Sequence, residues 1–237
     1  MINRNLFILS VGQIFSFTSP VVSVLLSGII GSAMTEINYL ATLPTALMIV
    51  GTAFGSLIAS KIMKIKGRKF GFSLAAIINS LFSLFCAYAI LINSFALFCL
   101  GNLIIGLSVA FAQQYRFAAT ESVIKANIPK AISLILLLGI VASLLGANIV
   151  SITKDFHYTT YVGSYIAMSL LTIIPFFFFI FYVNEERIES TKIKSQKSIY
   201  ELLSNKNIQL SILSAGVGYT TMSTLMTATP ISMNMMH

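Results

Sequence analysis

The stretch Phe70–Tyr115, FGFSLAAIINSLFSLFCAYAILINSFALFCLGNLIIGLSVAFAQQY, contains no Asp, Glu, Lys or Arg. A helix that crosses a membrane needs about 20 mostly apolar residues, so this stretch has the length of two crossings. Near its middle, the pair Asn93 and Ser94 supplies a polar turn. The stretch therefore predicts two successive membrane-crossing helices joined by a tight connection.

The rest of the chain has the same character. Of its 237 residues, 57% are hydrophobic and only 9% are charged, with a mean hydropathy of +0.89, whereas soluble domains average about 25% charged residues. This composition excludes an ordinary soluble protein and predicts an all-α polytopic membrane protein. The charge-free runs predict a six-helix bundle over 1–183, a linker over 184–206 and a seventh crossing helix over 207–237. The six crossings of the bundle are expected at about 6–30, 39–60, 70–92, 95–115, 131–153 and 158–183.

The basic residues predict the orientation of the helices. With the N-terminus in the cytoplasm, fourteen of the fifteen Lys and Arg residues fall on the cytoplasmic side, and only Lys154 falls outside. One miscounted helix would move every later connector to the opposite side of the membrane. The fourteen-to-one split therefore supports the predicted number of crossings. The net charge of +8 resides in short connectors rather than on one soluble face, which argues against a nucleic-acid partner.

Catalytic and metal-binding patterns are absent from the predicted crossings. Cys86 and Cys99 lie inside apolar runs and are expected to be core residues. His157 and His237 are too isolated for a metal site, and the crossings lack paired acids or a nucleophile with its base. The sequence therefore predicts neither an enzyme nor a cofactor, and the lipid bilayer is the expected surrounding.

Several segments resemble the major facilitator superfamily of transporters. The residues Gly67, Arg68 and Lys69 resemble the end of that family's loop signature, in which an Asp-Arg pair precedes them; Lys64 and Ile65 occupy the positions of that pair here. Glu121 resembles the acid that follows the fourth helix in many members. The resemblance implies the N-terminal half of a transporter of the bacterial inner membrane plus its seventh helix, with a cytoplasmic gate at Gly67, Arg68, Lys69, Arg116 and Glu121.

Arg116 has two interpretations. It could pair with Glu121 in the gate, or it could anchor the end of the fourth helix at the headgroups beside Tyr115 and Phe117. The Phe176–Phe179 run on the sixth helix is most simply lipid-facing.

In that family the first, fourth, fifth and seventh helices contribute to the central cavity, so polar residues on these helices are the candidate solute contacts. They are Gln13, Ser16, Pro20, Asn102, Gln113, Asn148, Thr220, Thr224 and Thr227. Asn102 stands where the fourth-helix signature usually has arginine. The alternative for each hydroxyl and amide is a bond to a neighbouring helix, which contributes about 0.6 kcal/mol on average.

Two stripes of small residues allow close approach between helices. One comprises Gly51, Gly55 and Ala59, and the other comprises Gly139, Ser143 and Ala147. In the family these helices form much of the interface between the two halves of the transporter. The stripes could equally pack inside the six-helix bundle.

Together these observations predict a secondary carrier that moves a small solute by alternating access. No charged residue lies mid-membrane, so a neutral or amphiphilic solute is expected, and a coupling carboxylate is absent from these helices. Because alternating access needs two bundles, the chain is expected to be an incomplete N-terminal part. A separate C-terminal half or a second copy of the chain would complete it. The alternatives are a non-transporting membrane scaffold and an inactive gene fragment.

Overall fold

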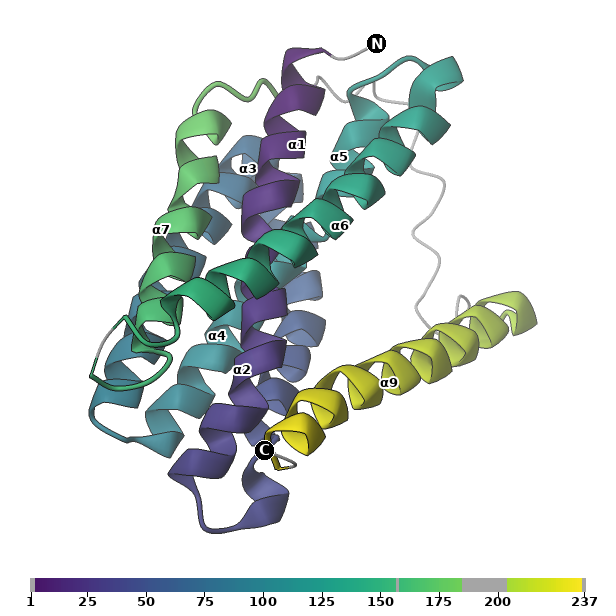
Figure 1. The fold of residues 1–237 in the computed structure, drawn as a ribbon. Coiled ribbons are helices and arrows are strands. Elements are labelled where there is room, and N and C mark those ends of the chain that lie inside the picture. The colour runs from purple at the N-terminus through teal and green to yellow at the C-terminus, as the bar shows by residue number, and fades with distance from the viewer. Residues whose placement is uncertain (1–2, 157, 185–203, 236–237) are drawn as a thin grey trace. The chain divides into compact units, whose positions relative to one another are not determined.

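The computed structural model describes residues 3–156, 158–184 and 204–235. The chain forms two compact units, Met1–Asn184 and Glu185–His237. The described part of the first unit consists of helices and loops without a strand (Figure 1). Its elements are α1 (Arg4–Ser16), α2 (Thr18–Met34), η1 (Asn38–Leu40), α3 (Leu43–Leu91), α4 (Phe95–Ala112), α5 (Tyr115–Glu121), η2 (Lys125–Asn127), α6 (Ile128–Thr153) and α7 (Val162–Phe179).

The first predicted crossing is a single span interrupted near its middle. Helix α1 ends at Ser16 and α2 begins at Thr18, and the two run in line (Figure 1). Pro20 lies one turn beyond the interruption and has no N–H, so it cannot donate to the carbonyl of Ser16. The hydroxyl of Thr18 donates to the carbonyl of Phe15 at 2.6 Å. Together the two parts cover Arg4–Met34, long and apolar enough to cross a membrane.

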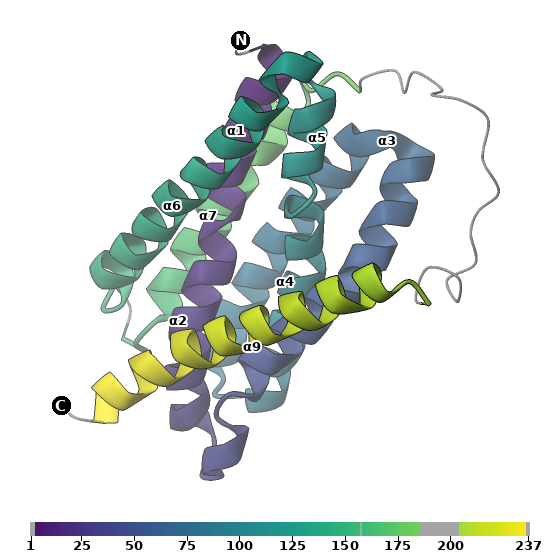
Figure 2. The ribbon, with the colours of Figure 1, turned by 90° about the vertical axis from the view of Figure 1, so that its right-hand side faces the viewer.

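The second and third predicted crossings form one helical element. Helix α3 runs from Leu43 to Leu91 and is interrupted only at Gly67, where φ is +83° and ψ is 165°. The expected connector after residue 60 is therefore helical up to the kink. The two halves fold back on each other, since a side chain at Gly71 would meet Met63. Figure 2 shows this turn at the same end of the bundle as α5 and the N-terminus.

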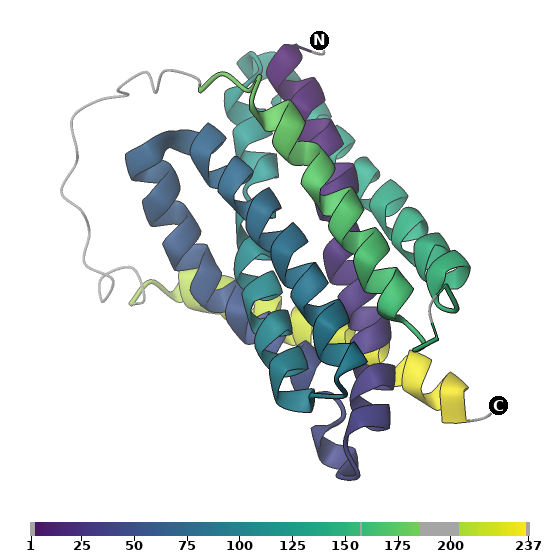
Figure 3. The same cartoon turned by 90° about the vertical axis from the view of Figure 1, so that its left-hand side faces the viewer.

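Five helical stretches of the described chain are long and apolar enough to cross a membrane. Because Leu43–Leu91 has the length of two crossings, these stretches have the combined length of six crossings, and the predicted bounds of the crossings stay a prediction. Helix α7 packs along α1 and the second half of α3 (Figure 3). The all-α polytopic fold class is confirmed.

Two apolar clusters fill the bundle. One contains Phe72, Tyr115 and Phe179, and the other contains Cys86, Phe98 and Tyr165. Cys86 and Cys99 are both buried, as the sequence predicts. Burial is uneven among the helices: the apolar window of α6 is only 17% buried, against 61% for that of α4 and α5. Helix α6 therefore lies at the edge of this unit.

The second unit contains α9 (Lys206–Met235), which begins next to the predicted seventh crossing and is long enough to span a bilayer. It is not among the five stretches that also meet the apolar criterion, so a seventh crossing stays a prediction. Residues 185–203 of the predicted linker lie outside the described residues.

Candidate functional site

An ion pair closes one end of the bundle. The guanidinium of Arg68 donates from Nε and Nη2 to the two carboxylate oxygens of Glu121, at 2.7 and 2.6 Å. The side chain of Arg68 is 17% exposed and that of Glu121 is 43% exposed. This two-point geometry fixes the orientation of both side chains and joins the second half of α3 to the end of α5.

Asn184 ties the end of the first unit to the kink of α3. Its side-chain oxygen accepts a hydrogen bond from the backbone N–H of Lys69 at 2.9 Å. A Cβ on Gly67 would lie 2.6 Å from the amide nitrogen of Asn184. The kink therefore needs glycine for two reasons: its positive φ, and the close approach of the Asn184 amide.

The start of α1 is fastened to the same end of the bundle. Asn5 donates to the carbonyl of Val183 at 2.9 Å and accepts from its N–H at 3.1 Å. Asn3 donates to the carbonyl of Ser122. We call the five side chains that hold this end together the loop junction: Asn3, Asn5, Arg68, Glu121 and Asn184.

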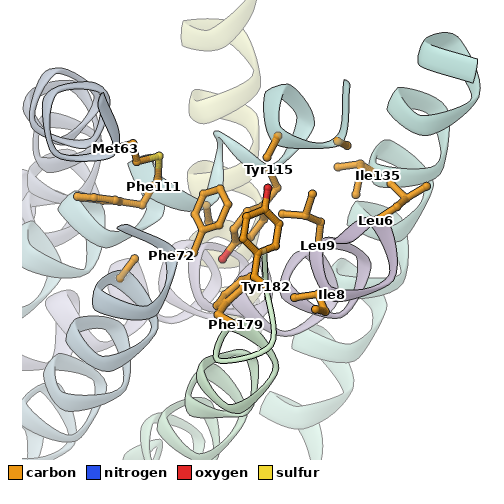
Figure 4. Packing of buried hydrophobic residues seen from close by; sticks show 14 of the residues in the cluster. Leu6, Ile8, Leu9, Met63, Phe72, Phe111, Tyr115, Ile135, Phe179 and Tyr182 are labelled. Carbon is orange, nitrogen blue, oxygen red and sulfur yellow. The ribbon is translucent and has the colours of Figure 1, made fainter. Parts of the chain in front are cut away.

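Four aromatic rings pack together within the first apolar cluster (Figure 4). Phe72 is at the centre, with ring centroids 4.8 Å from Tyr115, 5.4 Å from Phe179 and 5.9 Å from Tyr182. The hydroxyl of Tyr115 is within 3.0 Å of that of Ser16. Phe179 is fully buried, so the expectation that the whole Phe176–Phe179 run faces lipid is wrong for Phe179, because α7 turns this residue toward α1 and α3.

Among the predicted solute contacts, Gln13 has the most distinctive surroundings. Its side chain is 5% exposed, and its amide nitrogen lies against α6, 3.3 Å from where a Cβ on Gly139 would be. Ser16 lies one turn further along α1 and is also 5% exposed. No hydrogen bond joins the Gln13 amide to another described residue, whereas the Ser16 hydroxyl is paired with Tyr115.

Asn102 links helices. It is fully buried, accepts from the hydroxyl of Ser27 at 3.1 Å and donates to the carbonyl of Phe98 at 2.9 Å. Its oxygen thus links α4 to α2, which is the kind of bond that the second interpretation describes, and its nitrogen bonds within α4. Asn79 has the same role toward Ser19, at 2.9 Å.

The other predicted solute contacts differ in their surroundings within their own units. Gln113 and Pro20 are half-buried. Asn148 is exposed and donates to the carbonyl of Leu144 in its own helix, at 2.7 Å. Thr220 and Thr224 are exposed on α9 and bond to its backbone. The side chain of Thr227 lies outside the described residues.

Arg116 does not pair with Glu121. Its side chain is exposed, with Nε 3.4 Å from the carbonyl of Gln113 and the guanidinium 5.8 Å from the centre of the Phe117 ring. Arg68 occupies both oxygens of Glu121 instead. This arrangement agrees with an interfacial anchor.

The two small-residue stripes have different surroundings. A Cβ on Gly51 would meet the backbone carbonyl of Leu103, and one on Gly55 would lie 2.8 Å from the carbonyl of Leu107. Ala59 is fully buried. This stripe therefore packs inside the bundle, and its assignment to an interface with another half does not hold. Gly139 is half-buried, and Ser143 and Ala147 are exposed, so the stripe on α6 remains available for an interface.

The interior of the described bundle contains polar side chains but no charged ones. Its buried polar residues are serines, threonines, asparagines and one glutamine, and no buried Asp, Glu, Lys, Arg or His occurs among the described residues. No group of three metal-ligating residues occurs in that part of the chain either. Such an interior can donate and accept hydrogen bonds without holding a counter-charge.

Sequence reasoning missed most of the loop junction. The long-range partners of Asn3, Asn5 and Asn184 lie more than a hundred positions away, so local patterns do not identify them. Their common residue type and their positions at predicted helix ends were the available signals.

Comparisons with known proteins place the chain among transporters. The family model described as "Sugar (and other) transporter" matches residues 31–206. The riboflavin transporter RfnT of Brucella anthropi is 30% identical over 233 residues, which cover 97% of this chain and 58% of that protein. The uncharacterized MFS-type transporter YdeG of Bacillus subtilis is 29% identical over 153 residues, 65% of this chain and 36% of that protein. The chain thus spans little more than half the length of the first of these relatives, and no solved structure matches it.

Proposed function

Because the chain belongs to the sugar (and other) transporter family, within the major facilitator superfamily, we propose that it is part of a secondary carrier for a small neutral or amphiphilic solute. The observation that carries the proposal about the solute is the uncharged interior of the described bundle. A charged solute would need a counter-charge there, because an unpaired charge away from water is costly. Riboflavin, which the Brucella anthropi relative is named for, is a neutral amphiphile and is the solute we propose to test first.

The proposed mechanism is alternating access in a bacterial inner membrane. Carriers of this kind rock one helical bundle against another around a site between them. The described first unit supplies one bundle, and α6 with its exposed stripe supplies a surface for the second. A separate chain that corresponds to the rest of the relatives, or a second copy of this chain, is the partner we propose.

The loop junction is the proposed cytoplasmic gate of this bundle. The pair of Arg68 and Glu121, together with Asn184 on Lys69, holds the kink of α3, the end of α5 and the segment after α7 in one arrangement. A rigid end lets the bundle move as one body, which rocking requires.

Uptake of radiolabelled riboflavin by cells that cannot make it tests the proposal. The chain is expressed alone and together with the part of the Brucella anthropi transporter that lies beyond the aligned region. We expect riboflavin uptake above that of vector-only cells in at least one of the two strains, and glucose is the comparison solute. Glucose uptake without riboflavin uptake would move the proposed substrate to sugars. Failure of every solute in both strains would favour a non-transporting scaffold or an inactive fragment.

A further inference from the structure

Three buried side-chain oxygens have no hydrogen-bond partner among the described residues: Oγ of Ser23, Oγ1 of Thr45 and Oη of Tyr165. Ser23 and Tyr165 are both fully buried. Leaving such a group unsatisfied costs about 1–3 kcal/mol, and in a bilayer core no bulk water relieves the cost. The cost falls on two helices that pack against each other, since Ser23 lies on α2 and Tyr165 on α7.

Ser23 is the middle one of three buried serines on one face of α2. Ser19 and Ser27 lie about one turn before and after it, and all three are fully buried. The hydroxyl of Ser19 donates to Asn79 on α3 at 2.9 Å, and that of Ser27 donates to Asn102 on α4 at 3.1 Å. This face of α2 therefore contacts its neighbours through hydroxyls, and the hydroxyl of Ser23 is the one of the three without a direct partner.

Tyr165 reaches the same place from α7. Its ring packs edge-on against that of Phe98 on α4, with centroids 5.6 Å apart. Its hydroxyl lies near the side chains of Ser23, Ser27 and Asn102, but these side chains do not bond to it directly. Polar groups that lie near each other without a direct hydrogen bond are commonly joined by an ordered water molecule.

We propose that Ser23 and Tyr165 bind one enclosed water molecule, which joins α2 to α7. Each hydroxyl can donate and accept. The side-chain oxygen of Asn102 accepts from Ser27 and has a second acceptor site. A buried water makes about three hydrogen bonds, which Ser23, Tyr165 and Asn102 can supply. A neutral ligand also suits an interior in which no charged side chain is buried among the described residues.

The first test measures thermal unfolding of the purified full chain in lipid nanodiscs, without solute. Ser23→Ala and Tyr165→Phe each remove one partner of the water, so each is expected to lower the unfolding temperature by about 2–4 °C. The double variant is expected to lose little more than either single variant, because both changes act on the same water. Ser80→Ala is the comparison, since it breaks a direct bond of 2.9 Å to Ser169, and it is expected to lower the unfolding temperature as well.

The thermal results can contradict the proposal in two ways. A rise or no change in both single variants would show that the two hydroxyls share no partner. Additive losses in the double variant would show that they act independently. Either result would overturn the proposal.

The second test distinguishes a shared water from a direct bond between the two hydroxyls. Hydroxyl radicals that an X-ray pulse generates from an enclosed water oxidise the side chain beside it, and mass spectrometry locates the added oxygen. Tyr165 and Tyr115 are a matched pair, because both are buried and Tyr115 has a direct partner in Ser16 at 3.0 Å. We expect Tyr165 to be oxidised severalfold faster than Tyr115, and Ser23→Ala to remove this difference.

Oxidation of Tyr165 as slow as that of Tyr115 would overturn the proposal, even if the double variant shows coupling, because the two hydroxyls would then bond directly. Fast oxidation of Tyr165 that persists in Ser23→Ala would overturn it too, because Ser23 would not hold the water. Neither test uses a solute, so the proposed carrier function is tested separately by the uptake experiment.

Discussion

Gly67 shows how one residue fixes the course of the chain. Its φ of +83° reverses a long apolar helix, so that Met63 on the first half of α3 meets Gly71 on the second half. The same residue lets the Asn184 amide approach and bond to the N–H of Lys69. Backbone conformation and tertiary contact therefore depend on one missing side chain.

Gly67→Ala is predicted to lower stability. Forcing a non-glycine residue into this region costs about 1–3 kcal/mol, and the added Cβ would displace Asn184. Thermal unfolding in detergent measures the effect. Gly139→Ala makes the same change at a helical position where only a flexible amide tip is close, and its stability is expected to be unchanged or higher. Equal losses in the two variants would contradict this explanation.

The ion pair of Arg68 and Glu121 is predicted to contribute a measurable coupling. A double-mutant cycle with Arg68→Gln and Glu121→Gln is expected to give about 0.5–1 kcal/mol, since the pair is two-point and only partly exposed. Lys154 and Asp155 are the comparison pair, 4.0 Å apart with side chains 50% and 74% exposed, and their coupling is expected to be near zero. A coupling energy near zero for Arg68 and Glu121 would show that this pair does not stabilise the loop junction.

At the scale of elements, the tightest contact joins the first half of α3 to α4. Gly51 and Gly55 on α3 lie against the backbone of α4, and Gly106 on α4 lies against the carbonyl of Met48 on α3. Thr52 adds a hydrogen bond to the carbonyl of Gly106 at 3.1 Å. The small residues on both helices allow this approach without loss of helical structure.

Gly51→Ala is predicted to separate these two helices. Its Cβ would collide with a backbone carbonyl that cannot rotate away, and overpacking of this kind costs about 1–3 kcal/mol. The unfolding temperature is the measurement. Ala147→Leu adds more volume on the exposed stripe of α6 and is expected to change stability by less than about 0.5 kcal/mol. A tolerated Gly51→Ala would show that the α3 and α4 contact is looser than described.

At the scale of the whole molecule, the basic residues of the described connectors lie at two different ends of the first unit. The loop junction gathers the N-terminus, the kink of α3, the end of α5 and the end of α7 at one end of the first unit. Lys154 follows α6, and α6 starts beyond α5 and ends one crossing later, so Lys154 lies toward the other end. The orientation of these two ends in the membrane stays a prediction.

Cysteine labelling in intact cells tests that orientation. A maleimide that cannot cross membranes is predicted to label Lys154→Cys in intact cells, and Lys64→Cys only after the cells are opened. The native Cys86 and Cys99 are buried, so their background labelling is expected to be low. The reverse pattern would invert the orientation, and labelling of both sites in intact cells would contradict the odd number of crossings predicted between the two connectors.

Transport is predicted to be insensitive to a pH gradient across the membrane. The described interior contains no buried ionisable carboxylate, and intramembrane carboxylates are the usual carriers of protons. Solute uptake by the chain and its partner bundle is measured with and without an imposed gradient. Uptake that rises severalfold with the gradient would place a coupling acid in the partner bundle.

The sequence predicted the all-α membrane fold class because hydropathy summed over a short window depends on the residues of that window alone. A run without charges such as Phe70–Tyr115 is apolar whatever surrounds it, and the pair Asn93 and Ser94 breaks it at a fixed place. Local hydropathy does not register a kink inside a helix, which is why the predicted connector after residue 60 turned out to be helical up to Gly67.

The sequence by itself determined a membrane protein of this family, with Gly67, Arg68 and Glu121 as candidates for one end. Only the tertiary structure decided that Glu121 pairs with Arg68 rather than with Arg116, that Asn102 links helices, and that the Gln13 amide has no partner among the described residues. Residue types and spacing state what a side chain can bond to. Which of its possible partners it meets depends on how helices distant in sequence pack and rotate against one another.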